Sequence, residues 1–190
     1  MNHLSYHIIP NRKRLINKFY QSLFFIFLMS GGLRAQPTVP PEFRVKAVFV
    51  YNFTQFIDWP KDAFEFDEEP LIIGVLGDNP FGTNLEEAVK GERVGTHPIQ
   101  VRYFKDIADL SKCHILYINL NQPDAVKRAI NSLAGHSTLT IQDMEEFPQW
   151  GGMIRFFINE SKINLVINTT AAKAAKLRIS SKLLKVAKIY

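Results

Sequence analysis

Two continuous apolar runs limit the folds open to this chain of 190 residues more than any other feature. Residues 71–77 read LIIGVLG after Pro70, and residues 113–120 read CHILYINL. Runs of this length are typical of strands that are buried on both faces. Such strands occur in parallel sheets that are covered by helices on both sides, so the runs predict an α/β domain.

Helical segments alternate with the predicted strands. Residues 81–91 follow the first run, and either Thr83 or Asn84 can cap a helix there. Residues 122–133 follow the second run and have apolar residues at helical spacing. Two further strands are predicted at residues 99–104 and 137–141.

The last third of the chain predicts an antiparallel hairpin and two short helices. Residues 152–158 and 162–168 flank Asn159-Glu160-Ser161, a pattern typical of a hairpin. Residues 170–176 and 180–189 are predicted as closing helices, the second of them basic. The fold class is therefore a single, three-layer-like α/β domain with a mainly parallel, mixed sheet, a C-terminal β-hairpin and closing helices.

Residues 44–59 (RVKAVFVYNFTQFIDW) predict a helix that is apolar on two sides, and Pro60 is expected to end it. One stripe consists of Val45, Val48, Phe49, Asn52, Phe53 and Phe56, and the other of Ala47, Val50, Tyr51, Thr54 and Ile57. A helix of this kind is covered on two sides. The sheet can cover one stripe, and the other requires another helix, the start of the domain or a second copy of the chain.

The first 35 residues are typical of a secretory signal. Basic residues between positions 12 and 18 precede an apolar core at 22–29, and Ala35 provides a small residue before Gln36. The sequence thus predicts a signal peptide at 1–35 that is cleaved near Ala35, a proline-rich lead-in at 36–42, and one domain at 43–190. The mature protein is therefore predicted to be exported.

The formal net charge of +5 lies in the predicted signal, which holds five basic groups and no acid. The basic isoelectric point is therefore no argument for a nucleic-acid partner. A smaller asymmetry remains, because the residues from Ala171 onward hold six basic groups and no acid. That segment is either a solvated face or a docking surface.

No set of residues in the sequence has the spacing that catalysis or a metal site requires. Residues 77–84 (GDNPFGTN) have the glycine spacing of a phosphate-binding loop but lack its lysine, so a tight turn is expected. Cys113 and His114 are adjacent in a strand and point to opposite faces, so they cannot form a nucleophile–base pair. Cys113 is expected to be buried. We predict no catalytic residue, no metal and no cofactor.

Two other groups of residues each allow two interpretations. Asp143, Glu145 and Glu146 could form an acid pair, although Asp143 also fits a helix cap after a strand. Gly151 and Gly152 could give a sharp entry to the hairpin or approach a ligand closely.

Six pieces of the sequence, taken in order, resemble the YfiR/HmsC-like family of exported bacterial proteins. They are VKAVFVYNFTQFIDWP, IGVLGDNPFG, CHILYI, TLTIQD, GGMIRFFINESKINLVIN and LRISSKLLKVA. The resemblance implies a periplasmic domain without known catalysis. The best-described member represses an inner-membrane diguanylate cyclase by contacting its periplasmic part, and an outer-membrane lipoprotein relieves that repression. Related domains serve as input modules of sensor kinases.

The resemblance also implies a homodimer. Many members carry paired cysteines that form disulfides, whereas this chain has Cys113 alone. Control through an internal disulfide is therefore not expected here.

The functional prediction is a periplasmic regulator that represses a diguanylate cyclase and so controls cyclic-di-GMP and biofilm formation. The alternative is a small-molecule-binding sensor or the input domain of a sensor kinase. The predicted contact residues are Tyr51 and Phe53 on the first helix, Asp78, Phe81, Gly151 and Gly152 at loop ends, and Lys182 and Lys185 on the final helix.

Overall fold

The structure is a computed structural model and describes residues 39–190. The predicted signal peptide and its cleavage point lie outside the described residues. The strands are β1 (Ile57–Asp58), β2 (Leu71–Gly77), β3 (Arg93–Val94), β4 (His97–Phe104), β5 (Ile115–Asn119), β6 (Leu139–Gln142), β7 (Ile154–Asn159), β8 (Lys162–Ile167), β9 (Arg178–Ile179) and β10 (Lys188–Ile189). The helices are α2 (Pro41–Phe56), α3 (Asn84–Val89), α4 (Pro123–Ser132), α5 (Thr169–Ala174) and α6 (Ser181–Leu184), with short 3-10 turns at Lys61–Ala63 and Ile107–Asp109.

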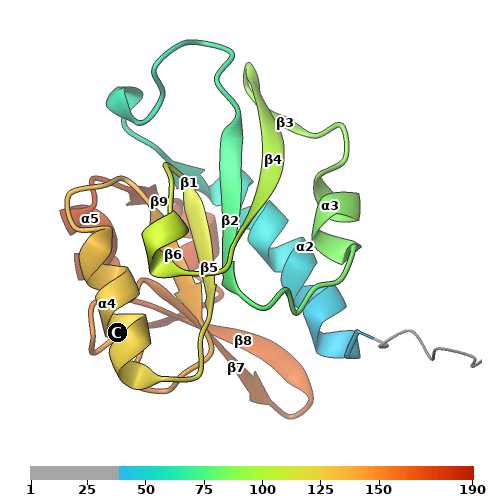
Figure 1. Cartoon of the computed structure of the whole chain (residues 1–190). Helices are drawn as coiled ribbons and strands as arrows, with labels where there is room; N and C mark the ends of the chain where they lie inside the picture. The colour runs from blue at the N-terminus through green and yellow to red at the C-terminus, as the bar shows by residue number, and fades with distance from the viewer. Residues whose placement is uncertain (1–38) are drawn as a thin grey trace, which may run out of the picture. The chain divides into compact units, whose positions relative to one another are not determined.

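Eight strands form one mixed sheet in the order β10-β8-β7-β6-β5-β2-β4-β3 (Figure 1). The central strands β4, β2, β5, β6 and β7 are parallel. β3 is antiparallel to β4, and β8 is antiparallel to β7 and parallel to β10. A separate pair, β1 and β9, is antiparallel. The predicted fold class is confirmed, including the hairpin of β7 and β8. Its two turn residues, Glu160 and Ser161, have the positive φ angles of 49° and 60° that a two-residue hairpin loop requires.

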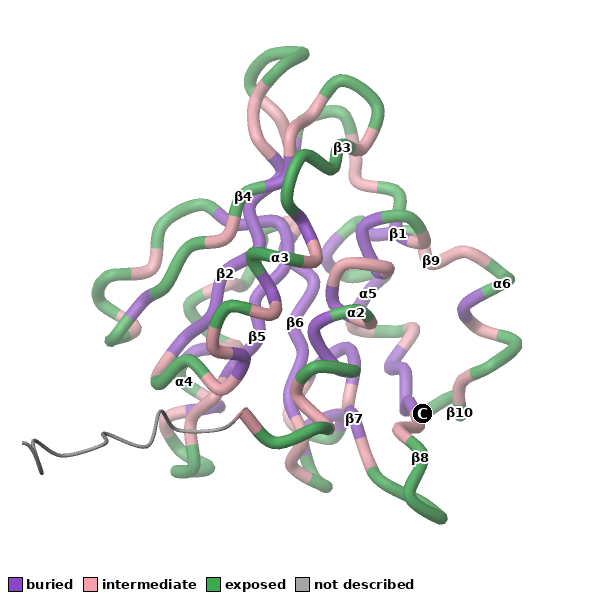
Figure 2. Tube along the Cα trace, turned by 90° about the vertical axis from the view of Figure 1, so that its right-hand side faces the viewer, coloured by how far each residue is buried: buried purple, intermediate pink, exposed green. Residues whose placement is uncertain are grey.

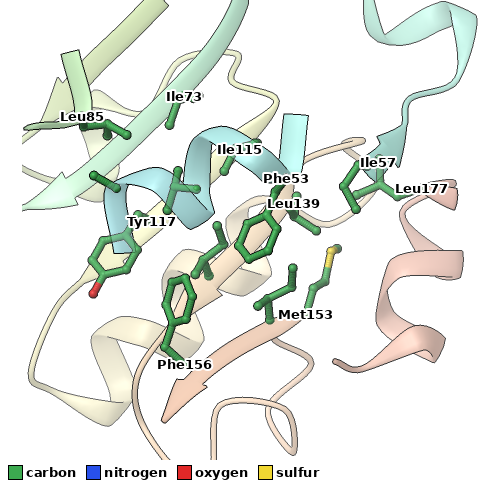
Figure 3. Close-up of a cluster of buried hydrophobic side chains, with 14 of the residues drawn as sticks. Phe53, Ile57, Ile73, Leu85, Ile115, Tyr117, Leu139, Met153, Phe156 and Leu177 are labelled. Carbon is green, nitrogen blue, oxygen red and sulfur yellow. The ribbon is translucent and has the colours of Figure 1, made fainter. Parts of the chain in front are cut away.

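Helices cover both faces of the sheet. Side chains of α2 and α3 pack with one face in a cluster that includes Phe53, Leu85 and Ile73 (Figure 3). Side chains of α4 pack on the other face, where Val126 and Ala129 meet Leu116. Figure 2 shows that β5 and β6 are buried along most of their length and that the tip of the β7–β8 hairpin is exposed. The predicted burial of the central strands on both faces is therefore confirmed.

The first helix is shifted from its predicted bounds. Helix α2 begins at Pro41 and ends at Phe56, three residues before Trp59. Ile57 is extended, with φ −115° and ψ 129°, and pairs with Ile179 of β9. Pairing with a distant strand has overridden the helical periodicity of these residues, so Pro60 is not what ends the helix.

The second predicted closing helix is also wrong in extent. Helix α6 has only four residues, and residues 188–189 form β10, which runs parallel to β8. The main-chain N–H of Tyr190 donates to the carbonyl oxygen of Ile167 at 3.0 Å. The outer edge of β8 offers these residues main-chain partners that a continued helix would not use. A strand that forms only through such long-range pairing leaves no local pattern in the sequence.

Candidate functional site

The inner side of α2 belongs to the core. Phe53 is fully buried and its ring stacks on Phe156 of β7, with centroids 5.9 Å apart (Figure 3). The prediction that Phe53 anchors a partner is therefore wrong. The physical reason is that α2 turns this residue towards the sheet, whereas other residues of its predicted stripe point outward.

The outer side of α2 carries apolar residues in contact with solvent. Val45 and Val48 are 48% and 50% exposed, and Phe49, Asn52 and Phe56 on the same stripe are half-buried. Beside them, the β7–β8 hairpin contributes Ile158, which is 54% exposed, and half-buried Ile163 on the same face of the sheet. We call these seven residues the α2 outer surface. Its apolar side chains suit a contact with an apolar partner surface, and exposed Arg44 lies one helical turn before Val48 on the same side of α2.

Tyr51 lies to one side of this surface. The residue is half-buried, and its hydroxyl donates to Oε2 of Glu92 at 2.7 Å. This hydrogen bond raises the pKa of Tyr51 above its ordinary value. The contact fastens α2 to the turn before β3, so Tyr51 is held by its own chain and contributes less to an outer contact than the sequence predicted.

The loop after β2 is a tight turn, and it does not present Phe81. Phe81 is fully buried, and its ring lies edge-on to Tyr117, with centroids 4.8 Å apart. The prediction that Phe81 is exposed is wrong, because the side chain of Asn79 accepts the N–H of Phe81 at 2.9 Å and the turn directs the ring inward. Asp78 is exposed as predicted. The expected side-chain cap of α3 is not formed.

Gly151 and Gly152 serve the packing of the loop before β7. Gly152 is buried, and a Cβ atom there would lie 2.3 Å from the ring of Phe147. Gly151 has φ +93° and lies near Ile130 of α4. Asp78 follows the carboxyl end of β2 on the far side of β5 and β6. The structure thus does not bring Gly151 or Gly152 together with Asp78 in one site.

The two lysines predicted as contacts are exposed near the C-terminus. Lys182 lies in α6, and Lys185 follows that helix. They do not share a long helical face, because the chain turns into β10 three residues later. Their contact with a partner stays a prediction.

A buried lysine joins α2 to the sheet, and the sequence analysis missed it. Lys46 is 3% exposed, and its Nζ lies 2.6 Å from Oδ2 of Asp143 and 3.8 Å from Oε1 of Glu42. The hydroxyl of Tyr117 donates to the other oxygen of Asp143 at 3.3 Å. Asp143 therefore forms an ion pair rather than the helix cap or acid pair that was considered. The sequence signal that could have indicated this ion pair is the position of a lysine among the apolar residues of α2.

Cys113 and His114 immediately precede β5 and are both buried. The ring of His114 accepts the N–H of Ile72 at Nδ1 (3.0 Å), contacts the carbonyl oxygen of Ala63 through Nε2 (3.2 Å), and stacks on Phe64. Burial lowers the pKa of His114 to about 4, so the ring is neutral at pH 7. Burial raises the pKa of the Cys113 thiol to about 12. The predicted burial of Cys113 is confirmed, and neither group is poised as a nucleophile or base near neutral pH.

One cavity lies at the amino ends of β5 and β6. It has a volume of about 410 Å³ and opens between the segment that follows the 3-10 turn at Ile107–Asp109 and the end of α4. Its lining includes Lys112, Cys113, Leu133, His136, Thr138 and Lys176. Both lysines already form ion pairs, Lys112 with Glu69 at 2.9 Å and Lys176 with Asp62 at 3.3 Å. The cavity is large enough for a small organic molecule.

Within the described part of the chain, no group of three or more His, Cys, Asp or Glu side chains is placed to hold a metal ion. No helix among residues 39–190 has the length and apolar character needed to cross a membrane.

These observations define the class of the protein. It is an α/β domain with a mixed sheet, helices on both faces and an apolar outer surface. A profile of the YfiR/HmsC-like family matches residues 43–188. The chain belongs to the YfiR/HmsC-like family, which fits a periplasmic regulator of signalling proteins. The resemblance seen in the sequence is thereby confirmed.

Two solved structures are partly similar to this chain. A conserved domain protein from Vibrio cholerae has a TM-score of 0.50 and 13% identity, with coverage of 77% of this chain and 59% of that chain. The ABC domain from Streptococcus pneumoniae in complex with L-Trp has a TM-score of 0.46 and 13% identity, covering 63% and 55%. The match thus spans less than two thirds of either solved structure. No curated protein is significantly similar to this chain.

Proposed function

We propose that this chain is a periplasmic regulatory protein that binds and represses an inner-membrane signalling protein, and that this partner is a diguanylate cyclase. The family match over residues 43–188 carries the proposal. The exposed apolar residues of the α2 outer surface support it, since exposed apolar patches commonly mark protein contacts. In this proposal the protein controls cyclic-di-GMP and biofilm formation, and an outer-membrane lipoprotein relieves the repression.

The proposed contact has no need of chemistry by this chain. Binding alone shifts the partner towards its inactive conformation if this chain binds that conformation more tightly than the active one. A sensor kinase in place of the cyclase would be controlled in the same way. A homodimer that uses part of the same surface is compatible with either partner.

Deletion of the gene is expected to raise cyclic-di-GMP, and Val48→Glu is expected to reproduce part of that rise. A carboxylate in the centre of the α2 outer surface must be desolvated on binding, and we expect affinity for the captured partner to fall at least tenfold, or about 1.4 kcal/mol. In-cell crosslinking with mass spectrometry identifies the partner, and nucleotide extraction measures the effect.

Gln149→Glu is the matched control, because it adds the same charge at an exposed position that is not on the α2 outer surface. Both variants should melt like the wild type, since each changed residue is in contact with solvent. If deletion leaves cyclic-di-GMP unchanged and no inner-membrane protein is captured, the cyclase proposal is wrong. A captured sensor kinase would identify the other class of partner.

The cavity at the amino ends of β5 and β6 favours a second candidate function, a small-molecule-binding sensor. Its volume of about 410 Å³ suits a small ligand, and bound ligand would stabilise the fold. In a thermal-shift screen of small organic acids and amines, a true ligand at 100 times its Kd adds about 2.7 kcal/mol. Ser132→Trp, which places an indole at this cavity, should abolish the shift. A shift that persists in the variant would place the ligand elsewhere.

A further inference from the structure

The outer edge of β4 is open along most of its length. On its inner side, β4 pairs with β2 from Ile99 to Phe104. On its outer side, β3 pairs only with His97 and Pro98 (Figure 1). The stretch from Val101 onward therefore has no neighbouring strand on that side. Unpaired edges of this kind are templates for the addition of another strand.

The direction of the main-chain groups can be read from one hydrogen bond. The N–H of Ile99 donates to the carbonyl oxygen of Glu92 at 3.1 Å. The main-chain N–H and C=O groups of Ile99 therefore point away from β2. Main-chain groups alternate along a strand, and the register with β2 is continuous from Ile99 to Phe104. The N–H and C=O groups of Val101 and Tyr103 therefore also point outward and are available to an added strand.

A groove lies beside this edge. It is formed between α3 and β4 and has a volume of about 460 Å³. Val89, Ile99 and Val101 line its apolar part, and Thr83, Glu86, Glu87 and Lys90 line its polar part. The side chains of Val101 and Tyr103 lie on the same face of the sheet as this groove, because they are in register with Ile73 and Val75 of the α2-side core. An added strand would therefore place alternate side chains over Val89, Ile99 and Val101, beside the polar residues of α3.

Positive charge on the opposite face of β4 determines which kind of segment can be added. Arg102 is exposed, and no carboxylate pairs with it among the described residues. Lys105 follows the strand and is also exposed. The segment from 101 to 105 thus holds two cations and no acid. A second copy of the chain would bring these cations against each other, whereas a strand with carboxylates opposite Arg102 would be attracted.

We propose that the outer edge of β4 binds an extended, acidic segment of the membrane partner as an added strand. Its apolar side chains face the groove beside α3, and its carboxylates face Arg102. Main-chain hydrogen bonds to Val101 and Tyr103 supply the register, as in other cases of strand addition. The inference rests on the proposed function, because it names a second contact with the same partner.

A synthetic peptide tests the edge without the partner. The probe is acetyl-Val-Glu-Val-Glu-Val-Glu-Val-amide, and the control peptide has Lys in place of Glu. NMR with hydrogen exchange should show slower exchange of the Val101 and Tyr103 amides with the acidic peptide, and at least tenfold weaker binding of the basic peptide. Val101→Pro, which removes one outward N–H at an edge position that tolerates proline, should abolish binding.

Val101→Ala is the matched control, because it shortens the same side chain and keeps the N–H; it should retain detectable binding. Equal binding of the two peptides, no protection at millimolar acidic peptide, or binding that survives Val101→Pro would overturn the proposal. So would a wild-type dimer that Val101→Pro converts to a monomer, since the edge would then be occupied by a second copy.

Cyclic-di-GMP separates this inference from the proposed function. If deletion raises the nucleotide and Val101→Pro represses like the wild type, the regulator proposal stands and the edge proposal fails. If deletion has no effect although the acidic peptide protects Val101 and Tyr103, the edge binds a strand but the proposed function fails.

Discussion

Phe53→Ala is expected to lower the free energy of unfolding by about 3–5 kcal/mol. The side chain is fully buried and packs on Phe156 and Phe49, so truncation leaves a cavity between α2 and the sheet. A domain of this size has a total stability of only about 5–15 kcal/mol, so the variant should melt far below the wild type. Urea denaturation followed by tryptophan fluorescence measures the change.

Val48→Ala is the matched control on the same helix. Because Val48 is 50% exposed, its truncation should change the free energy of unfolding by less than about 0.5 kcal/mol. Equal effects of the two substitutions would contradict the orientation of α2 that the structure shows. A wild-type stability of Phe53→Ala combined with a loss of partner binding would support the original sequence prediction instead.

Acidification is expected to remove about 3 kcal/mol of stability through His114 alone. Burial lowers the pKa of this residue from 6.5 to about 4 in the folded state. The unfolded chain therefore takes up a proton below pH 6.5, while the folded chain stays neutral until about pH 4. The contribution is fully present above pH 6.5, falls as the pH drops from 6.5 to 4, and is absent below that window.

The measurement is the free energy of unfolding at several pH values for the wild type and two variants. His114→Gln has no titrating ring, so its stability should fall less steeply between pH 6.5 and 4 than that of the wild type, although it starts lower at pH 7. His136→Gln removes an exposed histidine and should keep the wild-type slope. Identical slopes for all three proteins would show that His114 is not the group that titrates.

Local patterns predicted the elements whose formation depends on neighbours in the sequence. The buried run at 71–77, the hairpin turn at 159–161 and the helix at 122–133 all agree with the structure. Apolar periodicity and turn chemistry act over a few residues, so they can be read without knowledge of the rest of the chain. The α/β class follows from their order.

The site was predictable only in part, because exposure depends on what covers a residue. Phe53 and Val48 share one apolar stripe in the sequence, yet one is buried and the other is half exposed. Phe81 looked exposed in a polar loop, but its N–H donates to the side chain of Asn79 in a turn that directs the ring inward. The ion pair of Lys46 with Asp143 joins residues 97 positions apart, and no local pattern signals such a pair.

The sequence alone determined the buried central strands, the turns, the hairpin and the family, since these follow from side-chain periodicity and short motifs. Only the tertiary structure decided which side of α2 faces solvent, where the helix ends, and that the last residues form β10. It also decided that β4 keeps an open edge, because pairing is a property of two strands. Each of these outcomes depends on contacts between segments far apart in the chain, whose energies no single segment contains.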